Sequence, residues 1–411
     1  MLPTIEACFP AWIGLGIVVA LQWLTRLLML SVEYHRRRLL GSRSHPGQHG
    51  DLPALTMMVA AKDEEEHIKS CVSSLLMQDY PNLEVIAIDD RSDDQTPLIL
   101  KRLADESNGR LRVVSILHLE DGWFGKNNAM REGVAASGGD WLCFTDADCR
   151  LTSMRALTVA MQEALKHDID FLTITPVLEM NTLWEKVTQP ACAQSLMFWF
   201  QPSRVNDPNR ATAYANGAFM LMSRDCYNAI GGHDRVKTEV NEDIQLARYA
   251  KAAGLKLRMV ENDDLYRTQM YGSALQSFRG WSRILFGSLK SGWRLCFSLT
   301  ASLLFTVLPP MFLTISLIGR AMADAGQISN WTIAVGVWLT AVVLCQAAAW
   351  RFYSFLKANR WWSLTYVLGA GVTVAMLLNA LMKQIGVAST TWRGTTYRRD
   401  ERIDVPVQRV L

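Results

Sequence analysis

The chain has 411 residues, of which 50% are hydrophobic and 20% are charged, and its formal net charge is +3 at pH 7. This charge is too small to indicate a nucleic-acid-binding protein. The hydrophobic fraction is high for a soluble protein of this length, so we expect membrane segments beside one large domain. The eight cysteines are scattered and include no C-x-x-C pair. This pattern indicates reduced thiols in a cytosol-facing protein and argues against a zinc site.

The first apolar segment, residues 9–30, is interrupted only by Gln22 and Arg26, and a basic cluster at residues 36–38 follows it. A signal peptide has its charge before the apolar run and a small-residue cleavage site after it. The reverse order here predicts a retained transmembrane anchor. The positive-inside rule then places the chain after the cluster in the cytosol. We therefore expect residues 1–50 to be an N-terminal anchor and linker.

Between residues 51 and 272, short apolar runs alternate with helical patterns. Strands are predicted at 55–61, 84–89, 112–117 and 141–146, and helices at 64–76, 95–106 and 126–136. This alternation predicts an α/β fold with a mostly parallel, Rossmann-like sheet flanked by helices. Ligands of such sheets bind beyond the carboxyl ends of the strands, so polar motifs should directly follow the strands.

Residues 298–390 are predicted to form C-terminal transmembrane segments. Charge-free runs lie at Leu295–Gly319, Trp331–Trp350 and Trp361–Met382. Each is about the ~20 residues that a spanning helix needs, and tryptophans stand at several of their ends. Pro309 and Pro310 predict a kink in the first run.

The predicted topology conflicts with the basic tail at residues 391–411. Four spans put the C-terminus outside, whereas the arginines of the tail favour the inside; they are Arg393, Arg398, Arg399 and Arg402. A re-entrant last segment, broken at Gly369 and Gly371, would reconcile the charges.

Two further stretches have an interfacial pattern. Residues 273–297 carry an apolar stripe that includes Trp281 and a separate basic stripe that includes Arg279. This predicts a basic amphipathic helix on the membrane surface, or alternatively a core-packed helix with a solvated face. The apolar run at 191–200 is too short to span a membrane and fits either the core or the lipid-facing wall of a cleft.

Acidic clusters follow three of the predicted strands, as the fold requires. Their sequences are KDEEE at 62–66, DDRSDD at 89–94 and DAD at 146–148. One acidic turn is ordinary because aspartate caps helices, a role that remains open for Asp93 and Asp94. Two carboxylates two residues apart in extended chain point the same way. Asp146 and Asp148 can therefore hold one hard cation together with diphosphate oxygens, unless their turn is only a cap.

Two helix starts carry further candidate groups. Lys126 follows two glycines at a strand-to-helix junction and can meet a phosphate there, although the segment lacks the full P-loop pattern of an ATPase. Glu242 and Asp243 open another helix. The helix dipole alone favours acidic residues at that position, and a general base is the functional alternative.

The order and spacing of these motifs resemble family-two glycosyltransferases with the two-layer nucleotide-sugar fold, from about residue 55 to 281. The segments that carry the resemblance are VAAKDEEE, AIDDRSDD, GWFGKNNAM, FTDADC, NGAFMLMSRDCYNAIGGHD and NEDIQLARYAKAAG. The flanking apolar segments resemble the ceramide-glucosyltransferase, hopene-associated and carotenoid-glycosylating branches.

The resemblance implies a role for each matching position. The residues implied to bind the nucleotide-sugar are Asp63, Glu64, Asp89, Asp90, Lys126, Asp146, Arg279 and Trp281. Asp146 and Asp148 are implied to bind the metal, which is Mg2+ or Mn2+. Asp243 is implied to be the catalytic base, with Glu242 beside it. Asp63 stands where the family has Asn. Gly280 separates Arg279 from Trp281, which departs from the family's Q-x-x-R-W motif. Because processive polysaccharide synthases usually keep this motif, the departure argues against a processive synthase.

The implied enzyme is a membrane-bound, metal-dependent, inverting hexosyltransferase. It would transfer a sugar from a UDP-sugar to a lipid hydroxyl, with its catalytic domain on the cytoplasmic side of the inner or plasma membrane. The alternatives are a polysaccharide synthase, a nucleotidyltransferase or polyprenyl-phosphate sugar transferase, and a non-catalytic membrane scaffold.

Overall fold

The computed structural model describes residues 3–45, 51–392, 395–398 and 401–403. The chain forms two compact units. The sheet unit comprises Arg37–Glu179, Trp199–Met270 and Gly386–Leu411, and the helical unit comprises Met1–Arg36, Met180–Phe198 and Tyr271–Ile385. Most of the predicted linker, and Arg393 and Arg399 of the predicted basic tail, lie outside the described residues.

The sheet unit is built on an eight-stranded sheet. In spatial order its strands are β1 (Leu39–Leu40), β10 (Leu257–Asn262), β7 (Phe171–Thr175), β9 (Met220–Ser223), β5 (Trp141–Asp146), β2 (Leu55–Ala61), β3 (Leu83–Asp90) and β4 (Leu111–Ile116). Only β9 is antiparallel to its neighbours among these described strands. The predicted mostly parallel sheet is confirmed.

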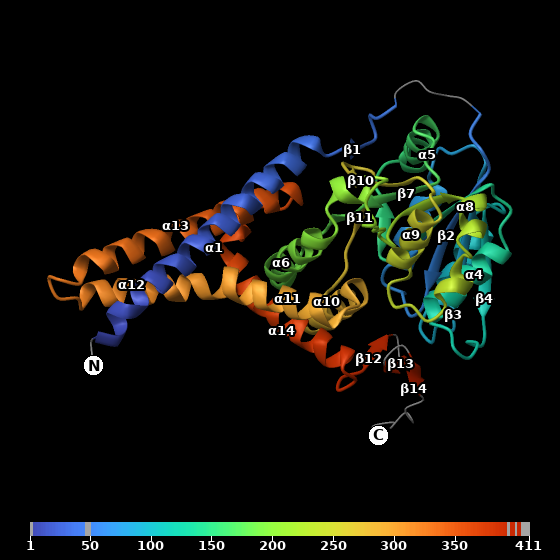
Figure 1. Ribbon diagram of the computed structural model, residues 1–411. Helices are drawn as coiled ribbons and strands as arrows, with labels where there is room; N and C mark the ends of the chain where they lie inside the picture. Colours follow the sequence, from blue (N-terminus) through green and yellow to red (C-terminus); the bar gives the residue numbers. More distant parts are fainter. Residues whose placement is uncertain (1–2, 46–50, 393–394, 399–400, 404–411) are drawn as a thin grey trace. The chain divides into compact units, whose positions relative to one another are not determined.

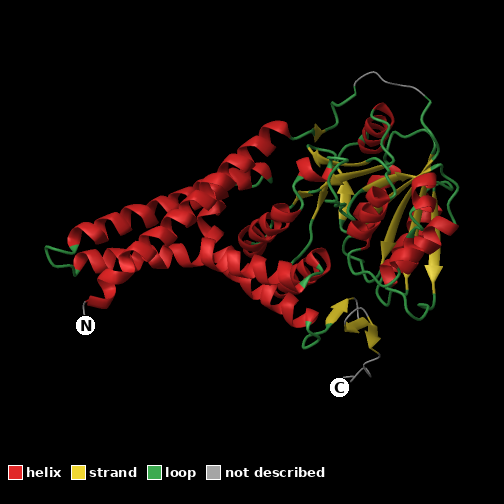
Figure 2. Ribbon diagram, viewed as in Figure 1, coloured by secondary structure: helices red, strands yellow, loops and turns green. Residues whose placement is uncertain are grey.

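Helices flank the sheet, as Figure 2 shows. They are α2 (Ile68–Leu76), α3 (Thr96–Glu106), α4 (Gly125–Ala135), α5 (Ala156–Lys166), α7 (Pro202–Val205), α8 (Arg224–Ala229), η1 (His233–Val236) and α9 (Glu242–Ala252). Met57, Met58 and Val59 of the central β2 are fully buried. Because the strands of this sheet are buried on both faces, their sequences are unbroken apolar runs.

One predicted helix begins later than its pattern indicated. The helix expected from Glu64 begins at Ile68, because the acidic residues before it form a turn. The backbone N–H of Glu64 donates to Thr96 Oγ1 at 2.9 Å, and that of Glu65 donates to Asp94 Oδ2 at 3.0 Å. These bonds tie the turn after β2 to the loop after β3.

Two small sheets complete the strands. The first joins β6 (Cys149–Leu151), β11 (Tyr266–Thr268) and β8 (Val177–Leu178). Because β6 follows β5 after only two residues, its pairing with β11 fixes the turn that contains Asp148. The second joins β12 (Thr390–Trp392), β13 (Thr395–Arg398) and β14 (Glu401–Ile403).

The helical unit consists of α1 (Pro3–Arg36), α6 (Leu183–Trp199, of which the unit includes residues up to 198), α10 (Ala274–Leu289), α11 (Gly292–Ser302), η2 (Leu303–Val307), α12 (Leu308–Ala321), α13 (Ile328–Phe355), η3 (Arg360–Thr365) and α14 (Tyr366–Gln384). The long helices α1 and α13 lie side by side, and α12 packs on α13 (Figure 1). Trp338 of α13 is fully buried, with its ring centroid 5.5 Å from that of Trp12 and 4.9 Å from that of Phe312.

Within the described residues, four helical stretches are long and apolar enough to cross a membrane. They are Phe9–Arg36, Gly292–Ala321, Ile328–Phe355 and Arg360–Gln384. Each predicted apolar segment lies inside one of them. The predicted break at Gly369 and Gly371 is absent, because α14 runs unbroken through both. Instead, Gly369 allows close packing: a Cβ there would lie 2.1 Å from the Val187 carbonyl oxygen.

The prolines predicted to kink the second stretch follow a π-helical segment, η2. Pro309 has no N–H, so the Phe305 carbonyl four residues earlier has no helical donor at that position. The Trp23 indole donates to this carbonyl at 2.5 Å. The amphipathic stretch expected over 273–297 is also divided: α10 ends at Leu289, the next residue, Lys290, has a left-handed backbone, and α11 follows.

Candidate active site

The acidic motifs meet at the carboxyl edge of the parallel strands. In the sheet register, Asp146 at the end of β5 pairs with Ala60 of β2, and Asp89 of β3 pairs with the next residue, Ala61. The three predicted clusters therefore follow adjacent strands in one plane. This placement follows from the parallel order β5-β2-β3, which the sequence pattern alone did not specify.

A partly buried cation, Lys126, lies at the centre of this edge. The Lys126 ammonium, in the first turn of α4, lies 2.6 Å from Asp146 Oδ1 and 2.8 Å from Glu242 Oε1. Burial opposes the charge on Lys126, but the two carboxylates outweigh it and hold the lysine pKa well above its ordinary value. The lysine is therefore a fixed positive charge at neutral pH.

Gly217 brings the backbone into this cluster, and a side chain at that position would displace the Lys126 ammonium. A Cβ on Gly217 would lie 2.9 Å from Lys126 Nζ, 3.5 Å from Asp146 Oδ2 and 3.6 Å from Asp243 Oδ2. Glycine at this position therefore lets a backbone N–H enter a site that is otherwise lined by charged side chains.

The Asp243 carboxylate accepts two backbone hydrogen bonds. Its Oδ2 accepts from the Gly217 N–H at 2.9 Å, and its Oδ1 accepts from the Ile244 N–H at 2.7 Å. Burial, and then the neighbouring Glu242, raise the Asp243 pKa to about 7, although Lys126 acts in the opposite direction. A carboxyl group with a pKa near neutrality can gain and lose a proton under physiological conditions, as a general base must.

The second aspartate of the D-x-D motif is also perturbed. Burial, together with repulsion by the Asp146 and Glu64 carboxylates, raises the Asp148 pKa to about 7. The Asp146, Asp148 and Glu64 carboxylates repel one another, and among these three described residues Lys126 pairs only with Asp146, so this oxygen donor set fits a hard divalent ion. No group of three or more His, Cys, Asp or Glu side chains with metal-ligand geometry occurs in the described ranges. A cation at Asp146 and Asp148 would thus need oxygens from its substrate as well.

The remaining carboxylates predicted to bind nucleotide lie on the ends of β2 and β3. Asp90 is buried, and the Arg91 guanidinium donates to both of its oxygens at 2.7 and 3.0 Å. Asp89 Oδ1 accepts from the Ser92 N–H at 3.3 Å. Asp63 has a φ of 53°, a conformation that both Asp and Asn tolerate better than other side chains do. The conformation explains how Asp can stand where the family has Asn.

The loop after β3 contains acidic side chains with a structural function. Asp94 accepts from the Thr96 N–H at 2.9 Å, at the start of α3, and from the Glu65 N–H at 3.0 Å. These bonds lower the Asp94 pKa, against a burial effect that would raise it. Asp94 thus accepts a backbone N–H at the start of α3, although the N-cap residue itself is Gln95.

Two predicted site residues belong to the helical unit. Arg279 and Trp281 both lie on α10, where Arg279 is exposed and Trp281 is buried. A close contact explains why the inserted residue is glycine. A Cβ on Gly280 would lie 2.2 Å from the Tyr271 hydroxyl oxygen. The departure from the Q-x-x-R-W motif thus makes room for a tyrosine ring.

Asn127 is a buried positioning residue that the sequence analysis missed. Its side-chain amide donates to the Val236 carbonyl at 2.6 Å and to the Glu239 carbonyl at 2.9 Å. It thereby ties the start of α4, with Lys126, to the loop that leads to Glu242. Asn127 stands in the Gly-Lys-Asn-Asn segment that was already singled out for Lys126. It was missed because it carries no charge that would mark it as a functional residue.

His233 also escaped the sequence analysis as a site residue. It is fully buried, its Nδ1 lies 2.9 Å from the Tyr227 hydroxyl, and its ring contacts Phe144 of β5. Burial and the Lys126 charge lower its pKa to about 3, so the imidazole is neutral. Gly232 permits this packing, because a Cβ there would lie 2.4 Å from the Tyr227 ring.

Comparison with known proteins agrees with this geometry. Residues 56–231 match the family model described as Glycosyl transferase family 2. The 4,4'-diaponeurosporenoate glycosyltransferase of Staphylococcus aureus (strain USA300) is 24% identical over 277 residues, covering 64% of this chain and 71% of that protein. A mannosyltransferase from Pyrobaculum calidifontis, solved in complex with GDP-Man and Mn2+, has a TM-score of 0.53 at 15% identity, covering 90% of this chain and 99% of that chain.

Proposed function

We propose that this chain, which contains a family 2 glycosyltransferase domain, is a membrane-bound inverting enzyme that transfers a sugar from a UDP-sugar to a lipid hydroxyl. The observation that carries the proposal is the partly buried cluster of Lys126, Asp146, Glu242 and Asp243 around the Gly217 backbone. It combines a fixed positive charge for a diphosphate with a carboxyl group whose pKa is near neutrality.

The donor lies against the carboxyl ends of β2, β3 and β5. Asp63, Glu64, Asp89 and Asp90 on the first two strand ends bind the nucleoside, with Arg91 neutralising Asp90. The Lys126 ammonium attracts the diphosphate. A divalent cation, Mg2+ or Mn2+, held by Asp146 and Asp148 supplies further positive charge to the leaving diphosphate when it is bound. The mannosyltransferase of similar fold was solved with Mn2+, which supports this choice.

Transfer is a single displacement at the anomeric carbon. The acceptor oxygen forms a bond to that carbon while the bond from the carbon to the diphosphate oxygen breaks. The hydroxyl proton passes to the Asp243 carboxylate, and the electron pair of the broken bond leaves on the diphosphate. Attack from the face opposite the leaving group inverts the configuration. Glu242 keeps Lys126 in place and charged, at 2.8 Å from its ammonium.

A lipid acceptor is supported by two features. Four helices among the described residues are long enough to cross a membrane, and the basic cluster at residues 36–38 favours a cytoplasmic sheet unit. The Staphylococcus aureus relative is named for transfer to diaponeurosporenoate. We therefore propose a lipid in the cytoplasmic leaflet as the acceptor.

The test is transfer of labelled sugar into total lipid extract by the purified full-length protein. A panel of UDP-sugars and GDP-mannose is offered, with wild type and Asp243→Asn side by side, each with and without chelator. Label that enters the organic phase only for wild type, and only when metal is present, supports the proposal and identifies the sugar. Label in a high-mass aqueous product would indicate a polysaccharide synthase. Full activity of Asp243→Asn would indicate a phosphate acceptor, which needs no base. The absence of turnover with every donor would favour a scaffold.

A further inference from the structure

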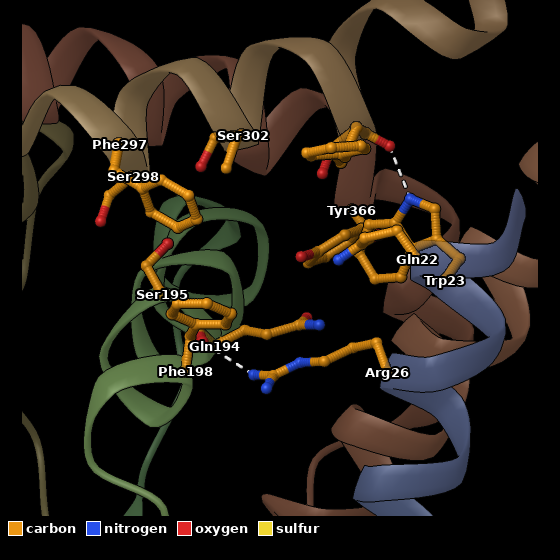
Figure 3. Close-up of a pocket in the computed structure, with 13 residues that line it drawn as sticks. Gln22, Trp23, Arg26, Gln194, Ser195, Phe198, Phe297, Ser298, Ser302 and Tyr366 are labelled. Atoms are coloured by element: carbon orange, nitrogen blue, oxygen red, sulfur yellow. Dashed lines mark hydrogen bonds between the residues drawn. The ribbon is translucent and has the colours of Figure 1, made fainter. Parts of the chain in front are cut away.

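The helical unit contains a mainly apolar pocket with a few polar side chains, which the proposed transfer reaction does not use. Its volume is ≈ 140 Å³, and Figure 3 shows side chains from α1, α6 and α11 directed into it. Its lining includes Gln22, Trp23 and Arg26 of α1, Gln194, Ser195 and Phe198 of α6, Phe297, Ser298 and Ser302 of α11, and Tyr366 of α14. A cavity of ~150 Å³ can hold a benzene-sized molecule, so this pocket has room for a small head group.

Arg26 is the charged group of this pocket. Only 6% of its surface is exposed, although it lies in a helix that is long and apolar enough to span a membrane. Ten residues separate it from Arg36, or ~15 Å along the helix axis. A charge at such depth is costly, and in membrane helices it marks a ligand or ion site.

Arg26 has no directly paired carboxylate among the described residues, although Glu33 of the same helix attracts it at longer range. The guanidinium donates to the Gln194 carbonyl at 3.2 Å, and its carbon lies 5.7 Å from the centroid of the Phe198 ring. Within the described ranges, no carboxylate lies at ion-pair distance from it. A guanidinium has five donors in a planar fork that fits a carboxylate or phosphate, and most of these donors remain available.

The neighbouring polar atoms are also incompletely paired. The side-chain oxygens of Gln22 and Gln194 are buried and have no hydrogen-bond partner among the described residues. Both amides line the pocket, and a rotation of either amide would direct its N–H2 group inward. Buried groups left without partners cost free energy, so a ligand that bonds to them is favoured.

The flank of the pocket is apolar. Phe198 and Phe297 stack with ring centroids 5.7 Å apart, and they are 38% and 45% exposed. An acyl or isoprenoid chain attached to a head group at Arg26 could continue along these rings. We propose that the pocket binds the carboxylate or phosphate head group of an anionic lipid, held by the Arg26 guanidinium.

The test measures lipid binding by native mass spectrometry of the full-length protein in neutral detergent. No sugar donor is present, so the result is independent of the proposed transfer activity. Two lipid pairs with matched tails are compared: dioleoyl phosphatidic acid against dioleoylglycerol, and oleate against oleyl alcohol. We expect wild type to prefer the anionic member of at least one pair by ~10–100-fold, the range of charge-assisted hydrogen bonds. The absence of preference in both pairs would overturn the proposal.

Variants separate the pocket from general attraction of anions. Arg26→Gln should lose the preference, whereas Arg320→Gln, which removes an exposed arginine from α12, should keep it. Retained preference in Arg26→Gln would refute the site. Because loss of Arg26 could impair folding, Ser302→Phe provides a second test: it keeps the arginine and fills the pocket, and it should also weaken binding. Competition by inorganic phosphate at the concentration of the lipid would show a free-anion site and contradict the lipid proposal.

Discussion

Replacing Asp243 by asparagine tests the base most directly. Asparagine keeps the size of the side chain but cannot accept the hydroxyl proton at neutral pH. Loss of a general base typically lowers the rate by ~10²–10⁴-fold, so we expect kcat to fall by that factor. This corresponds to about 3–5 kcal/mol in the activation free energy.

The structure also sets the effect of this substitution on folding. Both Asp243 oxygens accept backbone N–H bonds, so the amide must turn its N–H2 group toward one of these donors. The loss of one such bond costs about 1–3 kcal/mol. The raised pKa means that the buried charge is itself unfavourable at pH 8, and its removal offsets part of this cost. We therefore expect a folded protein with intact donor binding.

The assay pairs initial rates of sugar transfer with UDP binding by calorimetry and a thermal melt. Asp225→Asn is the matched control, because Asp225 also lies in the first turn of a helix but is exposed. The control should keep full activity. The reasoning is refuted if Asp243→Asn retains more than about a tenth of the wild-type kcat, which is far above the expected range. Loss of UDP binding in the folded variant would instead assign Asp243 to the donor site.

Three other outcomes are expected. The kcat of wild type should fall about tenfold per pH unit below about 7, because protonation of the raised-pKa Asp243 removes the base, and a flat profile from pH 5 to 8 would contradict this. Gly217→Ala should weaken UDP-sugar binding while the protein stays folded, because the alanine Cβ would lie 2.9 Å from Lys126 Nζ. Unchanged KM and kcat would show that the lysine has room to move. Chelation should abolish transfer, and Asp148→Asn should raise the metal concentration needed for half-maximal rate by more than the ~10–100-fold seen for outer-shell partners. Metal-independent transfer by wild type would exclude a role for the cation.

The sequence alone determined the local elements of this protein. The bounds of β2 and β5 were predicted to the residue, because an apolar run ending in a polar motif marks a buried strand and its carboxyl end. The four long apolar helices of the described residues were also predicted, because the length of an apolar run and its lack of charge can be seen in the sequence itself. The motif order also indicated a resemblance to family-two glycosyltransferases, and it picked out the candidate carboxylates.

Only the tertiary structure decided which of these groups meet. Gly217 lies 91 residues after Lys126 in the chain, yet a Cβ on it would touch the lysine ammonium. No local pattern encodes that distance, because strand order is set by long-range pairing rather than by the runs themselves. The same applies to Arg26, which interrupts an apolar helix in the sequence and becomes a buried pocket charge only when α6 packs beside α1. Local periodicity reports the environment of each element, while contacts between distant elements depend on how the whole chain packs.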